Sequence, residues 1–202
     1  MPDRTHTLDD YITHIGDAVS RGASKSETVA SVKRVLTRAL ETPGWLPARC
    51  RRPDPECYAR HLLHEDPSGR FTIVVMVWQK GQRTPIHDHG GVWCVEGVYE
   101  GRIQVDRYEL DEPVAGDVAH FHDFEHIEAG IGETGALIPP VDYHTITNPF
   151  EPLAVTVHTY GGAMKSCRVY LPRPDGAFEV RTKDLSYTSR PGPYAAGAPA
   201  HG

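Results

Sequence analysis

The chain lacks the features that mark several large classes of protein. Its longest strongly apolar run, Phe71–Trp78, has eight residues, and a membrane-spanning helix needs about 20. Its 21 Lys and Arg are outnumbered by 27 Asp and Glu, so the formal net charge is −6 and no basic surface for phosphate contacts is predicted. Residues 1–10 are polar, which does not resemble an apolar leader. We therefore expect a cytoplasmic protein that binds neither membrane nor nucleic acid.

Cysteine is scarce and forms no local pair. The four cysteines, Cys50, Cys57, Cys94 and Cys167, include no CxxC motif. This pattern argues against a disulfide framework and against a zinc ribbon. We expect Cys50, Cys57 and Cys167 to be small buried apolar residues, and Cys94 is considered below.

The remaining composition is that of a globular protein. Of 202 residues, 39% are hydrophobic and 24% are charged, which suits one large domain or two small ones. The 12 His residues, and the 19 Gly with 17 Pro, stand out and require an explanation. The many Gly and Pro residues predict frequent turns.

Apolar residues at spacings of three and four predict two helices near the N-terminus. The first follows Thr7, which can cap it together with Asp10, and ends near Gly22. The second follows the capping box Ser24–Glu27 and ends before Pro43.

After these helices, short β-type runs alternate with turn residues. The predicted strands are Tyr58–Leu63, Phe71–Gln79, Gly91–Val95, Arg102–Glu109, Val118–Phe121, Thr145–Thr147, Leu153–Tyr160, Arg168–Leu171 and Phe178–Arg181. Many short strands at regular spacing favour a sandwich or barrel over a parallel α/β sheet. We expect a helical lead-in at 1–45 packed on the barrel, a β domain at 46–189 and a flexible tail at 190–202.

Two histidine motifs carry most of the chemical information. His87 and His89 share one strand face if they lie on a strand, and the spacing from Gly81 through them to Gly101 is similar to the first motif of the cupin superfamily. Further on, Pro139, His144 and Asn148 resemble the second cupin motif, with Val141 in place of its usual Gly. The resemblance implies a mainly β protein with a single cupin barrel (a double-stranded β-helix or jelly roll), two N-terminal α-helices, and a metal bound by His87, His89 and His144.

The fifth residue after the second histidine is Cys94, where most metal-binding cupins have a glutamate ligand. Three neutral imidazoles leave a divalent ion with its full charge and with open positions, which suits an anionic substrate and, for iron(II), dioxygen. Glu96 lies two residues too late to match that ligand, and we expect it to be a partly exposed strand carboxylate.

From about Tyr58 to Leu171 the chain resembles the cysteine dioxygenase-like thiol dioxygenases. Cys94 matches a cysteine that is thioether-linked to a tyrosine in the animal-type enzymes, and Thr156-Val157-His158-Thr159-Tyr160 is similar to the family's Ser-x-His-x-Tyr triad. Alternation along a strand places Thr156, His158 and Tyr160 on one face. The resemblance thus implies catalytic roles for Cys94, Thr156, His158 and Tyr160.

The substrate contacts are implied in the same way. Tyr58-Ala59-Arg60 resembles a Tyr-x-Arg motif whose arginine holds the substrate carboxylate, a role that suits the rigid donor fork of guanidinium. The 3-mercaptopropionate enzymes use a later arginine, which here would be Arg168. Either arginine stays open as the carboxylate partner. We expect core packing for Trp93 and Tyr143, and surface strand positions for His120, His122 and His126.

These observations lead to one hypothesis and several alternatives. The hypothesis is an Fe(II)- and O2-dependent dioxygenase that oxidises a small carboxylate-bearing thiol, with L-cysteine as the first candidate substrate and cysteine sulfinic acid as its product. Its alternatives are 3-mercaptopropionate, mercaptosuccinate or a bulkier thiol such as ergothioneine as substrate. Less favoured are a three-histidine cupin dioxygenase acting on a non-thiol and a non-enzymatic cupin that binds a small molecule.

Overall fold

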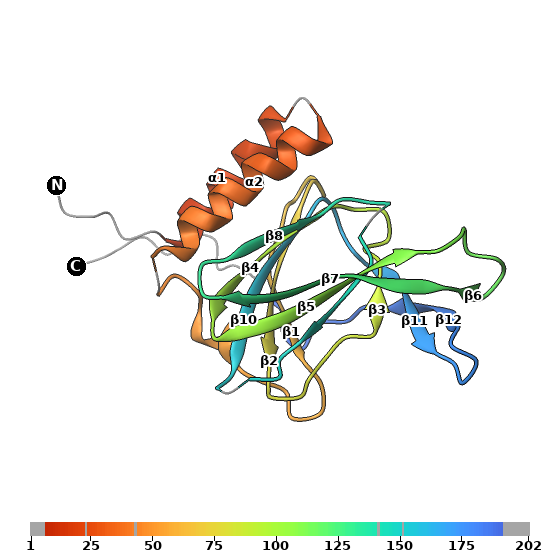
Figure 1. The fold of residues 1–202 in the computed structure, drawn as a ribbon. Helices are drawn as coiled ribbons and strands as arrows, with labels where there is room; N and C mark the ends of the chain where they lie inside the picture. The colour runs from red at the N-terminus through yellow and green to blue at the C-terminus, as the bar shows by residue number, and fades with distance from the viewer. Residues whose placement is uncertain (1–6, 23, 43, 141, 151, 192–202) are drawn as a thin grey trace, which may run out of the picture.

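The computed structural model describes residues 7–22, 24–42, 44–140, 142–150 and 152–191. Two helices, α1 (Leu8–Arg21) and α2 (Lys25–Leu40), are followed by a short 3₁₀ helix, η1 (Ala48–Arg51), and then by strands (Figure 1). Most of the predicted tail at 190–202 lies outside the described residues. No helix in the described part is long and apolar enough to cross a membrane.

Both predicted helix starts are confirmed, together with their caps. The Thr7 hydroxyl accepts from the backbone N–H of Asp10, whose carboxylate accepts from the backbone N–H of Thr7. The Ser24 hydroxyl accepts from the backbone N–H of Glu27. These contacts satisfy amide groups that the first helical turn leaves without a partner.

The strands form two antiparallel sheets that curl around a shared interior. The first has the order β1 (Ala59–Glu65), β2 (Thr72–Trp78), β10 (Ala154–Tyr160), β4 (Cys94–Glu100) and β8 (Thr134–Leu137). The second has the order β6 (Val118–Ala119), β12 (Phe178–Asp184), β11 (Ser166–Pro172), β3 (Ile86–His87), β9 (His144–Thr147), β5 (Arg102–Leu110) and β7 (Phe121–Gly130). The expected fold class, a mainly β single cupin barrel with two N-terminal helices, is confirmed.

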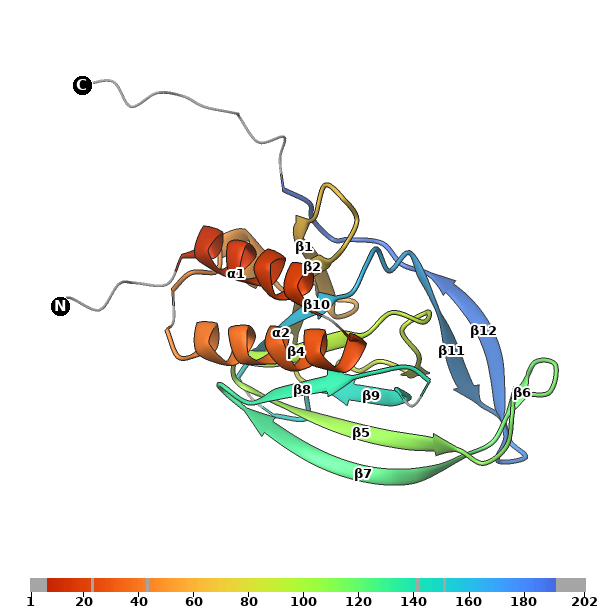
Figure 2. The same cartoon turned by 90° about the horizontal axis from the view of Figure 1, so that it is seen from above.

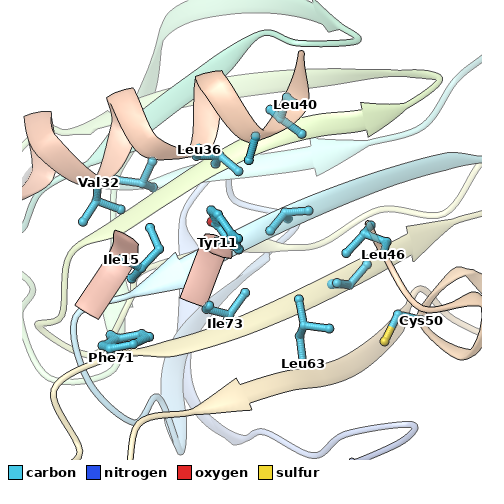
Figure 3. Packing of buried hydrophobic residues seen from close by; sticks show 14 of the residues in the cluster. Tyr11, Ile15, Val32, Leu36, Leu40, Leu46, Cys50, Leu63, Phe71 and Ile73 are labelled. Carbon is cyan, nitrogen blue, oxygen red and sulfur yellow. The ribbon is translucent and has the colours of Figure 1, made fainter. Parts of the chain in front are cut away.

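The two helices lie side by side along the outer face of the first sheet (Figure 2). From the helices, Tyr11, Ile15 and Leu36 point toward Phe71, which directly precedes β2, and Ile73, which lies in β2 (Figure 3). All five side chains are almost completely buried, so the apolar stripe predicted for each helix has its partner.

A close approach between α2 and β4 explains one glycine. A Cβ at Gly97 would lie 2.6 Å from Cδ1 of Leu40 and 3.1 Å from Cδ2 of Leu36. Because carbon atoms do not approach so closely without a shift, any larger residue at Gly97 would force the Leu40 and Leu36 side chains to repack.

A second core fills the barrel and explains the apolar run noted in the sequence. All seven residues of β2 are buried, because Ile73, Val75 and Val77 face the helices while Val74 and Met76 face the barrel interior. A strand covered on both faces reads as a continuous apolar run.

Several strand predictions were incomplete. β7 runs through Phe121–Gly130, but most of its side chains are exposed, so it lacks the alternation by which a strand is found in sequence. β8 was not predicted, and β4 spans Cys94–Glu100 where the sequence indicated Gly91–Val95. Cys57 is exposed, so the expectation that it is buried was wrong.

Candidate metal centre

Three histidines from two adjoining strands converge inside the barrel. His87 ends β3, His144 begins β9 and is its register partner, and His89 follows β3. One ring nitrogen of each lies within 4.8 Å of the other two. The ring centroids of His87 and His144 are 4.3 Å apart, and those of His89 and His144 are 5.0 Å apart. Such spacing is compatible with one shared metal ion.

The protein orients all three rings through the same nitrogen. Nδ1 of His87 lies 3.2 Å from the Pro85 carbonyl oxygen, and Nδ1 of His144 lies 3.0 Å from the Asp142 carbonyl oxygen. Nδ1 of His89 lies 2.9 Å from Oδ2 of Asp142. Because each Nδ1 faces an acceptor, it carries the proton and leaves Nε2 as the available donor atom.

The electrostatics keep the rings of His87 and His144 neutral. Burial, together with the neighbouring histidines, holds the pKa of His87 well below its usual range. The same two causes lower the pKa of His144 to about 4. Nε2 of His144 is buried without a hydrogen-bond partner, which is costly unless something binds it. Three converging imidazoles with an unpartnered buried nitrogen fit a divalent transition metal.

A pocket opens onto these histidines. Its walls include polar residues of the predicted site as well as apolar ones: Tyr58, Arg60, Met76, Trp78, Thr84, Pro85, Ile146, His158, Tyr160, Met164, Cys167, Val169, Lys183 and Leu185. Its described lining contains two cationic side chains, Arg60 and Lys183, and no carboxylate.

The two candidate carboxylate-binding arginines occupy different places. Arg60 is buried in the pocket wall, where its Nη1 donates to the Ser186 carbonyl oxygen at 3.2 Å. Arg168 does not line the pocket. Its side chain is exposed, and its Nε lies 3.7 Å from a carboxylate oxygen of Asp88. The structure therefore brings only Arg60 to the histidines.

Thr156 and His158 form a buried hydrogen-bonded pair on β10. Oγ1 of Thr156 lies 2.7 Å from Nε2 of His158 and accepts from Nε1 of Trp78 at 2.9 Å. Tyr160 shares this face of the strand and lines the pocket, and its ring centroid is 6.2 Å from that of His158. The hydroxyl and imidazole of the expected triad are thus in direct contact, with the phenol beside them.

Cys94 lies directly opposite Tyr160 in the pairing of β4 with β10. Opposed residues of an antiparallel pair have Cβ atoms about 4.5–5.5 Å apart. Burial raises the pKa of the Cys94 thiol and that of the Tyr160 phenol well above their usual ranges. Both groups are therefore protonated at neutral pH.

The sequence was also compared with those of known protein families. The sequence profile of the family described as "Cysteine dioxygenase type I" matches residues 3–173. The chain belongs to this family.

Three individual proteins that resemble the chain share about a fifth of their aligned residues with it. The chain is 22% identical to "Cysteine dioxygenase type 1" of Danio rerio over 176 residues, which cover 83% of this chain and 80% of that protein. A solved structure of the protein TT1209 from Thermus thermophilus is 19% identical, covers 56% of this chain and 91% of its own, and has a TM-score of 0.43. An RmlC-like cupin from Desulfovibrio desulfuricans is also 19% identical, covers 59% of this chain and 96% of its own, and has a TM-score of 0.43.

In this cysteine dioxygenase type I family member, one expectation about a carboxylate was wrong. Glu96 is not partly exposed, because its residue exposure is only 6% and its Oε2 lies 3.3 Å from Nδ1 of His158. Burial by itself raises the pKa of Glu96, but the contact with His158 outweighs it and lowers the pKa to about 2. Alternation along β4 places Glu96 on the same face as Cys94, and that signal was available in the sequence.

Other residues near the site were also missed. Asp142 stands inside the second motif, yet nothing in the pattern indicated that it orients two ligands. Lys183 joins the pocket only through the pairing of β12 with β11, opposite Cys167, and no local signal reveals a contact of that kind.

Structural roles were expected for the remaining candidates, and the structure agrees for most of them. Trp93 packs in the core beneath the helices, and Tyr143 packs in an aromatic cluster with Phe121. His122 and His126 are exposed on β7, where they contact Asp111 and Asp106. His120 is exposed as well, but it lies between β6 and β7 and in neither strand, so that part of the expectation was wrong.

Proposed function

We propose that the protein is an iron(II)- and O2-dependent thiol dioxygenase that converts a small carboxylate-bearing thiol into its sulfinic acid. One observation carries the proposal: the three oriented histidines, the buried guanidinium of Arg60 and His158, which is bonded to Thr156, line a single pocket in a cysteine dioxygenase type I family member. L-Cysteine is the first candidate substrate. The overall reaction adds both atoms of dioxygen to the thiol sulfur, which is oxidised while dioxygen is reduced.

The residues present suit iron(II). When bound by His87, His89 and His144, iron(II) would supply a site at which the thiol binds as thiolate and dioxygen is activated. None of the three proposed ligands carries a negative charge, so the thiolate would be the ligand that offsets the charge of the ion.

The chain's other residues bind and orient the substrate. Arg60 offers its planar donor fork to the carboxylate, and it is held in the wall by its bond to the Ser186 carbonyl. Tyr58, stacked on Trp78 with ring centroids 4.7 Å apart, forms a rigid apolar wall beside it. Because Tyr160 is protonated, its hydroxyl can donate a hydrogen bond toward negative charge that develops near the histidines.

The charges of the pocket lining should influence which thiol binds. Arg60 and Lys183 favour a carboxylate, and the described lining offers no carboxylate to an ammonium group. L-Cysteine, 3-mercaptopropionate, mercaptosuccinate and ergothioneine therefore differ in how well they match the pocket. Comparing them in one assay measures how strongly the pocket selects against the amino group.

The test is anaerobic loading with iron(II), followed by oxygen uptake and mass-spectrometric detection of sulfinate across these four thiols, with catechol as a non-thiol control. We expect uptake and sulfinate with at least one carboxylate-bearing thiol. His144→Ala should lose bound iron and turnover, whereas His126→Ala, which changes an exposed histidine, should keep both. No thiol-dependent uptake by iron-loaded protein, or full iron and turnover in His144→Ala, would overturn the proposal.

A further inference from the structure

Glu96 is a buried carboxylate that the proposed reaction does not use. It lies on β4 directly opposite His158 of β10, and its Oε2 is 3.3 Å from Nδ1 of that ring. This oxygen is buried and makes no hydrogen bond of good geometry with any described residue, and Nδ1 of His158 is the polar group that lies beside it. Glu96 also borders a cavity of about 180 Å³ between the sheets. A buried carboxylate oxygen with one neighbour points to a specific role for that neighbour.

The opposite side of the imidazole favours one of the two positions for its proton. The Trp78 indole can only donate a hydrogen bond, so Oγ1 of Thr156 is the acceptor in their 2.9 Å contact. The Thr156 hydroxyl has one proton of its own, and Nε2 of His158 lies 2.7 Å away. If Thr156 donates, Nε2 is the acceptor and the proton of the neutral ring resides on Nδ1. That N–H then faces Oε2 of Glu96.

We propose that Glu96 is a positioning residue, which accepts a hydrogen bond from Nδ1 of His158 and thereby holds the ring in the tautomer and orientation that accept from Thr156. The order of donation is Trp78 to Thr156, Thr156 to His158, and His158 to Glu96. Nδ1 also lies within hydrogen-bonding distance of the Cys94 sulfur, at 4.0 Å, but a thiol is a weaker acceptor than a carboxylate, so a small turn of the ring toward Glu96 gives the stronger bond.

A competing use of the same atoms is a metal site. Cys94, Glu96 and His158 each offer a ligand atom within 4.8 Å of the other two. A metal on Nδ1 would move the proton of a neutral ring to Nε2. The Thr156 hydroxyl would then face two donors, Trp78 and His158, and its own proton would lose the acceptor that Nε2 provides. The hydrogen-bond pattern therefore favours the positioning role over the metal site.

The first test reads the tautomer without any reaction. In metal-free protein labelled with ¹⁵N-histidine, long-range ¹H–¹⁵N correlation spectra distinguish a protonated Nδ1 from a protonated Nε2, and the His158→Gln spectrum identifies the signals of His158. We expect a protonated Nδ1 in the wild type and in Glu96→Gln, whose amide oxygen still accepts. Glu96→Leu should shift His158 toward the other tautomer or a mixture. Protonation at Nε2 in the wild type, or an unchanged tautomer in Glu96→Leu, would overturn the proposal.

The second test reads the effect on turnover, and this part rests on the proposed function. Glu96→Leu should lower kcat about tenfold, with iron content and KM within about twofold of the wild type, and Glu96→Gln should recover part of the loss. Glu128→Leu and Glu128→Gln, at an exposed carboxylate on β7, are the matched controls and should match the wild type. A loss confined to iron content or KM would overturn the positioning role.

The two proposals can fail separately. If the wild type oxidises no thiol, the proposed function fails, while the tautomer spectra still decide whether Glu96 positions His158. A zinc titration of the metal-free protein adds a further check. Saturation at one equivalent supports the hydrogen-bonding role, whereas a second equivalent that Glu96→Gln removes would assign Nδ1 to a metal and overturn it.

Discussion

The hydroxyl of Tyr11 lies 2.9 Å from the hydroxyl of Thr159, in a buried contact between α1 and β10. Side chains alternate along β10, so Thr159 faces the helices while Thr156, His158 and Tyr160 face the barrel interior. One strand therefore joins the helical layer to the candidate site. The helices do more than cover apolar surface, because they fix the strand on which the interior hydrogen bonds depend.

This contact leads to a prediction about stability. Tyr11→Phe should lower the free energy of unfolding by about 1 kcal/mol, because it leaves the Thr159 hydroxyl buried with one partner fewer. Urea unfolding of Tyr11→Phe, Thr159→Val and the double variant forms a double-mutant cycle. We expect the double variant to lose less than the sum of the single variants, and additive losses would contradict a direct bond.

A second prediction concerns Asp142, which contacts two of the histidines. Its side chain accepts from both the backbone N–H and Nδ1 of His89, and its carbonyl faces Nδ1 of His144. Asp142→Ala should weaken metal binding about 10–100-fold, as measured by titration against a competing chelator. Asp175→Ala, at an exposed turn, is the control and should bind as the wild type does. Equal affinity in the two variants would show that the ligands orient themselves without Asp142.

A third prediction separates the two arginines. Arg60→Gln should raise KM for a carboxylate-bearing thiol by about tenfold or more, because a charge-assisted contact in a buried wall is lost. Arg168→Gln changes an exposed side chain outside the pocket and should leave KM within about twofold. Steady-state oxygen uptake over a range of substrate concentrations measures both variants. The reverse pattern would move carboxylate binding to Arg168.

The opposition of Cys94 and Tyr160 gives a fourth prediction. After turnover with iron and dioxygen, we expect a thioether between the Cys94 sulfur and a ring carbon of Tyr160. The new bond replaces one S–H and one C–H, and dioxygen accepts the two electrons. Intact-mass and peptide-mass spectra should show a loss of two hydrogens in the wild type and none in Cys94→Ser or Tyr160→Phe. An unchanged mass in turned-over wild type would contradict this expectation.

A fifth prediction concerns acid stability. Hydrogen bonds from Arg70, offset in part by burial, lower the pKa of Asp66 from 3.8 to about 2. A carboxyl whose pKa is lower in the folded state contributes stability that is complete above its unfolded pKa and is lost as the pH falls toward the folded value. The stability difference between wild type and Asp66→Asn should therefore shrink between about pH 4 and pH 2. Thermal unfolding measured across that pH range tests this prediction, with Asp184→Asn as a control at an exposed carboxylate. A stability difference that does not change with pH would contradict the prediction.

Much of the fold could be predicted from sequence because its signals are local. The caps at Thr7 and Ser24, the helical stripes and the histidine spacings each depend on residues within a few positions of one another. The polar strand β7 could not be predicted, because it pairs with β5 at the outer edge of a sheet and buries little of itself. Its existence depends on backbone pairing with a distant segment, and that leaves little trace in side-chain pattern.

In the candidate site, too, the local motif could be predicted and the contacts between distant residues could not. The His-x-His pattern identified its residues, although β3 ends at His87 and the alternation expected of a strand does not extend to His89. The contacts of Glu96 with His158 and of Asp142 with His89 join residues more than 50 positions apart. Their positions follow from how the sheets pair, and burial then determines their chemistry. A single sequence offers the residue types and leaves open which pairs meet.

The pairing of β3 with β9 has a mechanical consequence. β3 has two residues, and its register with β9 pairs His87 with His144. The segment before β3 continues this junction, with Arg83 opposite Thr147 and a backbone hydrogen bond from Thr84 to Ile146. In the order of the second sheet, this junction separates β6, β12 and β11 on one side from β5 and β7 on the other. A metal held by these histidines would add a side-chain link across a junction that backbone hydrogen bonds already hold. The ion that serves the proposed reaction would therefore also stabilise the barrel wall, so its removal should lower the free energy of unfolding as well as abolish turnover.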